Sequence, residues 1–159
     1  MLDKELLMLN DAKVFVDREV RPFAAKFDEE GFLPQDLIKK MAANGFLGAC
    51  LPKEYGGLSM SSLNYGLLTE VFGKACCSVR ALLTVHSSLV GETINRWGSQ
   101  EQKNKWLPLI VKGEKIGAFA LTEPDVGTDA RNVKTSYVIE DDRFILNGKK
   151  KWITFGEIA

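Results

Sequence analysis

Apolar side chains recur every three or four residues through residues 1–112, which is the spacing of one face of an α-helix. Pro22 falls inside the first such stripe. It predicts a kink or a split there, because proline lacks an amide proton and crowds the preceding turn. Gly31 is expected to close this segment as a C-cap. The stripe consists of Leu6, Leu9, Ala12, Val16, Val20, Phe23 and Phe27.

Four further helices are expected, and residues at their ends mark where they begin and stop. Ser78 is a suitable N-cap, and Ser99 with Gln102 matches the S-x-x-Q capping box. Gly113 is the expected C-cap of the last helix. The expected helices cover about 34–44, 61–75, 78–97 and 100–112.

The pattern changes after the last of these helices, and strands are expected from there on. The apolar run IGAFAL (116–121) is consistent with a buried strand, and VKTSYVIE (133–140) alternates as a strand does. Two aspartates then predict a turn. In RFILNGKKKWITF (143–155), the pair Asn147-Gly148 is a strong hairpin signal between two further strands.

This change of pattern divides the chain into an N-terminal helical domain over 1–112 and an incomplete β domain over 113–159. A sheet of three or four strands that stops abruptly keeps an open edge and a half-covered face. We therefore expect a fragment, or a gene product cut short inside its second domain. The isolated chain is expected to aggregate through the open edge.

Composition and charge exclude several classes of function. Apolar residues make up 45% and charged residues 26%, as in an ordinary globular protein. The 21 basic and 21 acidic residues give a net charge of zero without a basic block, which argues against nucleic-acid binding. No apolar run approaches the roughly 18 residues of a membrane span, and the acidic N-terminus does not fit a signal peptide. Cys50, Cys76 and Cys77 are expected to be buried or inert thiols of a reducing cytosol.

One alternative for the turn TEPDVGTD (122–129) is a calcium loop, because its acids lie at near-alternating positions. A loop of the EF-hand type needs glycine at its sixth position and glutamate at its twelfth. Counted from Glu123, these positions hold Thr128 and Lys134, and Pro124 stiffens the start. We therefore expect no metal site.

A bound anion and a flat ring suit this segment better. The Gly127-Thr128 pair offers backbone amides and a hydroxyl to an anion. Thr122 lies at the end of an expected strand, where its hydroxyl can point at a ring. Trp152 and Thr154 would share one strand face that combines an aromatic surface with a hydroxyl. The alternative is that these are only turn residues, and that Trp152 is only a core aromatic.

The same segments resemble a known family. FALTEPDVGTD (119–129) and NGKKKWIT (147–154) resemble the middle-domain signature of the acyl-CoA dehydrogenases. LGACLPKEYGG (47–57) resembles the loop after that family's second helix, and GSQEQKNKWLPLIVKGEKIGAFALTEP (98–124) resembles the crossing between its first two domains. The resemblance covers nearly the whole chain. It implies an all-α N-terminal domain, a β-barrel-like middle domain and a C-terminal helical bundle, of which this chain lacks the last.

The resemblance also implies FAD as the cofactor. The Thr122 hydroxyl and nearby backbone donors would contact the pyrimidine end of the isoalloxazine and stabilise the charge of reduced flavin. Thr128 would contact the flavin pyrophosphate region and also the pantetheine arm of the substrate. Trp152 would pack near the ring, with the Thr154 hydroxyl near N5, the hydride acceptor. The implied cofactor-binding residues are Phe119, Ala120, Leu121, Thr122, Gly127, Thr128, Trp152, Ile153 and Thr154.

The implied reaction is the α,β-dehydrogenation of an acyl thioester, in fatty acid or polyketide metabolism. A carboxylate removes the α proton, the β hydrogen leaves as hydride to the flavin, and an electron-transfer flavoprotein or oxygen then takes the electrons. The family's base usually comes from the C-terminal domain, so no catalytic residue is assigned here. Glu123 is expected to be a structural turn acid. His86, the only histidine, is expected to pack in the core, or alternatively to line the acyl pocket.

Phe155 departs from the family, which commonly has asparagine at this position. WITFG (152–156) instead resembles the branch that acts on acyl groups carried by acyl-carrier proteins, so CoA and carrier-protein thioesters both stay open. The resemblance implies a homodimer or homotetramer in the cytoplasm, or in the mitochondrial matrix of a eukaryote. The chain alone is expected to bind FAD poorly. A non-catalytic helical interaction module and a flavin monooxygenase of the same fold are the alternatives.

Overall fold

The computed structural model describes residues 2–159, with side chains described from Glu5 onward. The first apolar stripe forms α1 (Leu2–Glu19), the 3-10 turn η1 (Arg21–Phe23) and α2 (Ala24–Glu30). The interruption lies at Pro22, and α2 ends at Gly31, whose φ of 70° is the left-handed C-cap conformation. The predicted split and the predicted C-cap are confirmed.

The other predicted helices also form. Ser99 and Gln102 make both bonds of a capping box, and Gly113 follows the last helix with a φ of 64°. The predicted N-cap at Ser78 is wrong, because the extended residue Cys76 precedes the helix and Ser78 already lies in its first turn. The elements are α3 (Gln35–Ala43), η2 (Phe46–Gly48), η3 (Lys53–Tyr55), α4 (Ser62–Gly73), α5 (Cys77–Leu82), η4 (Leu83–Gly91), α6 (Glu92–Trp97) and α7 (Gln100–Val111).

A π-helical stretch, η4, joins α5 to α6 in one continuous helix. It carries two fully buried polar side chains, His86 and Ser87. The Ser87 hydroxyl donates to the Leu47 carbonyl at 2.7 Å, so η4 is tied to η2 by a buried hydrogen bond.

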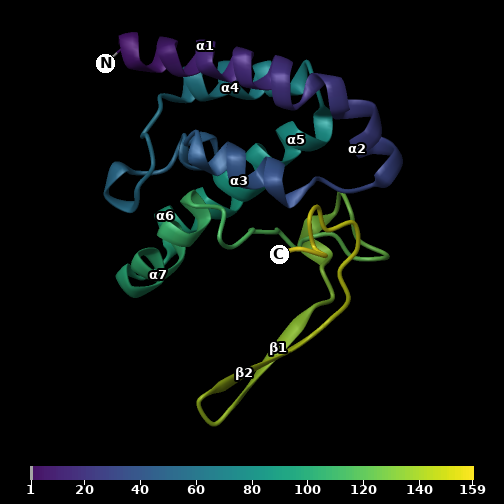
Figure 1. Cartoon of the computed structure of the whole chain (residues 1–159). Coiled ribbons are helices and arrows are strands. Elements are labelled where there is room, and N and C mark those ends of the chain that lie inside the picture. The colour runs from purple at the N-terminus through teal and green to yellow at the C-terminus, as the bar shows by residue number, and fades with distance from the viewer. Residues whose placement is uncertain (1) are drawn as a thin grey trace.

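Three phenylalanines form the centre of the helical core. Phe46, in η2, lies edge-on to Phe15 of α1 and to Phe72 of α4, with ring centroids 5.2 Å apart in both cases. The side chains of Phe46 and Phe72 are fully buried. Figure 1 shows α1 lying along α4, with α3 and α5 beneath them. Short local elements are therefore joined by contacts between residues far apart in the sequence.

The segment after α7 contains less β structure than predicted. One antiparallel hairpin forms, from β1 (Ser136–Glu140) and β2 (Arg143–Asn147), and the predicted turn at the two aspartates is confirmed. The predicted strand over 116–121 does not form, and Asn147-Gly148 does not make a hairpin turn. A Cβ on Gly148 would lie 2.2 Å from the Thr135 hydroxyl oxygen, because the chain leaving β2 continues past the start of β1 instead of turning back.

The chain after Gly148 also differs from the prediction. Residues 154–158 form turns, and Trp152 and Phe155 both have a positive φ of 61°. Trp152 and Thr154 therefore do not share a strand face, since the backbone between them is not extended. The strand predicted after Gly148 is therefore wrong, as is the one predicted over 116–121, and the sheet has two strands.

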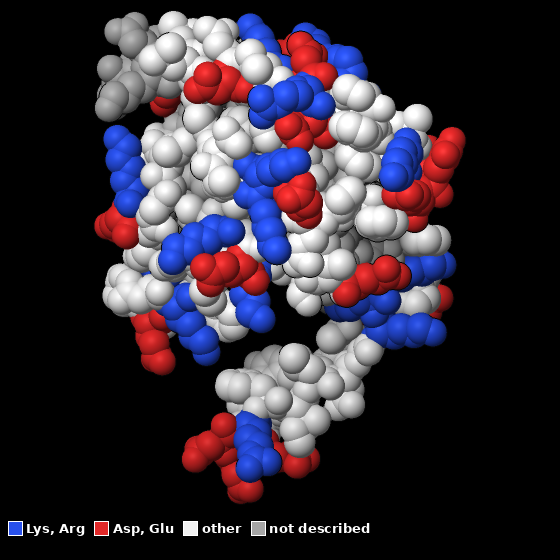
Figure 2. Space-filling view, in the orientation of Figure 1, with Lys and Arg blue, Asp and Glu red and all other residues white. Residues whose placement is uncertain are grey.

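The hairpin projects away from the helices (Figure 1), and every residue of both strands is exposed. Tyr137, Ile139, Phe144 and Leu146 share one face, because Tyr137 pairs with Leu146 and Ile139 with Phe144. Over the face of the molecule in Figure 2, acidic and basic side chains are interspersed. No helix in the described part of the chain is long and apolar enough to cross a bilayer.

Candidate functional site

One predicted cofactor segment, 119–122, is hydrogen-bonded to the two lysines that directly precede another, 152–154. The Lys151 amide donates to the Thr122 carbonyl at 2.8 Å, and Lys150 Nζ donates to the Leu121 carbonyl at 3.0 Å. These bonds set the segment 119–122 against the start of the segment 152–154. The pairing had no sequence signal, because the two segments are about 30 residues apart and neither is a regular strand.

A buried carboxylate lies at this junction. The Glu123 side chain is 4% exposed and accepts four hydrogen bonds, from the Lys134 amide, from the amide and hydroxyl of Thr135, and from Lys150 Nζ. These bonds, led by the one from the Thr135 hydroxyl, lower the pKa of Glu123 to about 2. Glu123 is the structural acid that the sequence predicted, and it is fully engaged by donors.

The turn after Glu123 is short and open. The Glu123 and Val126 amides each donate to the other residue's carbonyl, at 2.9 and 3.2 Å, and Val126 is buried. Gly127 and Thr128 are exposed, and no atom lies within 4 Å of the position that a Cβ on Gly127 would occupy. This leaves space for a ligand beside the two residues.

The predicted aromatic residue lies on the surface. The Trp152 side chain is 78% exposed, and Lys151 Nζ lies 4.5 Å from the centre of its ring. Trp152 is therefore not a core aromatic. Phe119 and Leu121 are also exposed, at 40% and 41%. Thr154 is exposed and Thr122 is half-buried. The apolar side chains and the threonine hydroxyls together suit a flat ring with a polar edge.

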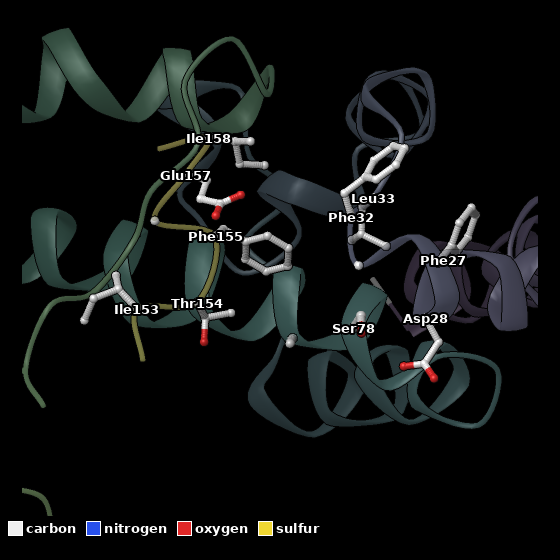
Figure 3. A pocket seen from close by; sticks show the side chains of 13 residues that line it. Phe27, Asp28, Phe32, Leu33, Ser78, Ile153, Thr154, Phe155, Glu157 and Ile158 are labelled. Carbon is white, nitrogen blue, oxygen red and sulfur yellow. The ribbon is translucent and has the colours of Figure 1, made fainter. Parts of the chain in front are cut away.

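Two of the predicted residues line a cavity of about 620 Å³. Ile153 and Thr154 line it together with the α2–α3 junction and α5 (Figure 3). Phe119, Leu121, Thr122, Gly127, Thr128 and Trp152 do not line it. Phe32, which the sequence did not single out, and Phe155, which the sequence marked only as a departure from the family, contribute aromatic walls.

The cysteine prediction holds in part. Cys50 and Cys76 are half-buried, whereas Cys77 is exposed. Burial raises the pKa of Cys50 to about 11, so this thiol stays protonated at neutral pH. Cys50 lines a second cavity, of about 440 Å³, between α4 and the η4–α6 helix.

His86 is a fully buried packing residue with both ring nitrogens engaged. Nδ1 accepts from the Gly117 amide at 3.0 Å, so Nε2 carries the proton that it donates to the Ile110 carbonyl at 3.0 Å. His86 lines neither of the two cavities. It therefore joins α7 and the segment after it to η4, as the packing interpretation predicted.

Acid is expected to destabilise the fold through His86. Burial lowers the pKa of His86 below its ordinary value of about 6.5, so below that pH the unfolded chain takes up a proton that the folded chain refuses. The contribution of His86 to the free energy of unfolding is fully present above about pH 6.5. It falls as the pH drops below that value, by up to about 1.4 kcal/mol per pH unit. Urea unfolding at pH 7.5 and pH 5.5 measures this, and equal stabilities at the two values would contradict it.

The sequence matches two family models. Residues 3–114 match the N-terminal domain of acyl-CoA dehydrogenase, and residues 118–159 match its middle domain. The curated short-chain specific acyl-CoA dehydrogenase of Clostridium acetobutylicum is 42% identical over 145 residues, which cover 91% of this chain and 38% of that protein.

Two solved structures resemble the fold along almost its whole length. Glutaryl-CoA dehydrogenase from Mycobacterium smegmatis in complex with FADH2 has a TM-score of 0.93 at 35% identity, covering 98% of this chain and 40% of that one. A structure described as the electron transferring flavoprotein of Acidaminococcus fermentans has a TM-score of 0.91 at 37% identity, covering 98% of this chain and 41% of that one. The chain thus spans 38–41% of the length of these relatives.

Proposed function

This chain belongs to the acyl-CoA dehydrogenase family, and on that premise we propose that the protein carrying it is an FAD-dependent α,β-dehydrogenase of acyl-CoA thioesters. The contact between Lys151 and Thr122 carries the proposal. It sets the two segments that resemble the family's flavin-binding motifs side by side. Their exposed apolar side chains and their threonine hydroxyls suit the isoalloxazine ring.

The residues proposed to hold FAD keep the roles that the resemblance implies. Phe119, Leu121 and Trp152 supply apolar surface. Thr122 supplies a hydroxyl for the pyrimidine end of the ring, and Thr154 supplies one near N5. The open space beside Gly127 and the exposed Thr128 suit the pyrophosphate and the pantetheine arm of the substrate. Ala120 and Ile153 complete the two segments.

Bound FAD would supply the acceptor for the β hydrogen, which leaves the substrate as hydride. The chain's own residues would hold the ring and the thioester in the correct relative orientation, since correct orientation lowers the barrier of the reaction. Glu123 is not the base for the α proton, because all its donors would first have to be displaced and its pKa of about 2 makes it a weak base. None of the described residues is assigned that role.

A CoA thioester is preferred to a carrier-protein thioester as the substrate. The sequence raised the carrier-protein branch through Phe155, but Phe155 packs against the helical core and has a structural reason to be aromatic. The Clostridium relative is an acyl-CoA dehydrogenase specific for short chains, which supports a short acyl-CoA. An electron-transferring flavoprotein is the proposed acceptor, supported by the Acidaminococcus structure. A homo-oligomer in the cytoplasm, or in a mitochondrial matrix, completes the proposal.

The test uses the longest protein that the reading frame of this chain encodes. We expect it to purify with FAD, and we expect anaerobic butyryl-CoA to bleach the oxidised flavin band. The same acyl group on an acyl-carrier protein is the matched comparison and should bleach it more slowly. Faster bleaching by the carrier-protein thioester would reverse the substrate assignment. Substrate-dependent oxygen consumption without bleaching would favour the monooxygenase, and a protein that binds no flavin would favour the interaction module.

A further inference from the structure

Glu123 and Lys150 form a largely buried ion pair next to the proposed flavin segment 119–122. Lys150 Nζ lies 2.9 Å from Glu123 Oε1, and the exposed fractions of the two side chains are 23% and 4%. Each group also has other partners, which a buried ion pair requires. Glu123 accepts from Lys134 and Thr135 at the start of the hairpin.

Lys150 extends this pair to the backbone that carries the flavin contacts. Its Nζ also donates to the Leu121 carbonyl, and the next residue, Lys151, donates its amide to the Thr122 carbonyl. Trp152 follows directly. Two consecutive lysines therefore fix residues 121–122 relative to 152–154, and Glu123 fixes the charged end of the first lysine.

A second ion pair, which also involves an acid of the Glu123–Val126 turn, differs from this one in its burial. Lys134 Nζ and Asp125 Oδ2 are also 2.9 Å apart, but their side chains are 70% and 71% exposed. Exposed pairs of this kind contribute little to structure. Each pair joins a lysine to a carboxylate of the same turn. The two pairs differ in burial, and only Lys150 also bonds to the 121–122 backbone.

We propose that Glu123 and Lys150 are positioning residues that set the distance between Thr122 and the Trp152–Thr154 segment, and thereby the fit of the flavin ring. This inference rests on the proposed function. Neither residue is proposed to touch the reacting atoms. Removal of the carboxylate charge is expected to release Lys150 from Leu121, after which the two segments separate while the helical domain stays folded.

The main variant is Glu123→Gln, made in the longest protein that the reading frame encodes. The amide group has the shape of the carboxylate, but it replaces one acceptor oxygen with an NH2 group that faces donors. We expect the dissociation constant for FAD to rise at least tenfold and the Lys151 amide to exchange hydrogen faster. We also expect the absorption spectrum and midpoint potential of the remaining bound flavin to shift. Lys150→Met should give the same result if Glu123→Gln folds poorly.

Two control variants separate positioning from stability. Asp125→Asn breaks the exposed pair and should change neither flavin affinity nor spectrum. Glu5→Gln changes a carboxylate in the helical domain that accepts from the Ser61 amide and hydroxyl and from Asn64. It should lower stability without moving the flavin spectrum.

Each outcome decides the inference. Faster Lys151 exchange together with weaker FAD binding and a shifted spectrum would support it. Unchanged exchange, or faster exchange with unchanged FAD binding and spectrum, would overturn the positioning role while leaving the proposed function intact. A flavin spectrum that Glu5→Gln shifts equally would reduce the effect to general stability. A wild-type protein without FAD would overturn the proposed function, and this inference with it.

Discussion

Truncation of Phe46 to alanine is expected to lower the free energy of unfolding by about 3–5 kcal/mol. Phe46 is fully buried and lies edge-on to both Phe15 and Phe72. These rings belong to α1, η2 and α4, so removal of the middle one leaves a cavity that no single helix can fill by moving. The loss therefore includes both the hydrophobic free energy of burying the ring and the cost of the cavity that its removal leaves.

Urea unfolding at pH 7.5 measures this loss, with Leu63→Ala as the control. Leu63 is 75% exposed on α4, so its truncation should change stability by no more than about 0.5 kcal/mol. A Phe46→Ala loss as small as that of the control would mean that the three rings do not form the centre of the core.

The helices were predictable because their signals are local. Pro22, Gly31 and the Ser99–Gln102 capping box each act within one turn of chain, and the structure has all three where the sequence places them. Ser78 failed because a helix start is decided by where the preceding chain becomes extended, here at Cys76. A good capping side chain two residues later cannot override that backbone.

The β segment was less predictable because its conformation depends on distant partners. Asn147-Gly148 and the two aspartates at 141–142 both favour hairpin turns, and local propensity does not decide between them. The turn formed at 141–142, where β1 and β2 pair directly. The chain after Gly148 runs past Thr135 and pairs with Thr122 instead. Both contacts join residues that no periodicity in the sequence connects.

The candidate site divides in the same way. The resemblance named the residues of the site, but not the Glu123–Lys150 ion pair that joins its two segments. Nothing in the sequence distinguishes Glu123 from Asp125, or Lys150 from Lys149, as the charges that become buried. Burial depends on how the turn, the hairpin and the 150–151 segment pack together. Charge pairing across 27 residues is visible only in the folded chain.

Replacement of His86 by leucine is expected to lower the free energy of unfolding by roughly 2–4 kcal/mol, because one buried and one half-buried backbone group lose their partner. The Ile110 carbonyl loses a donor and the Gly117 amide loses an acceptor. Leucine fills similar space and offers neither. Gly117 precedes the segment 119–122 by two residues and packs tightly on Val90, since a Cβ there would lie 2.7 Å from a Val90 methyl carbon. The variant should therefore also loosen the start of the proposed flavin surface.

Urea unfolding of His86→Leu at pH 7.5 and pH 5.5 tests this loss of stability together with the pH dependence expected from His86. The variant should be less stable than wild type at pH 7.5, and its stability should no longer fall between the two values, because the only histidine is gone. His86→Gln is the matched control. It can still donate to Ile110 and accept from Gly117, so it should recover part of the stability while also losing the pH dependence. A leucine variant as stable as wild type would mean that water replaces both hydrogen bonds, and that His86 does not hold α7 and the following segment to η4.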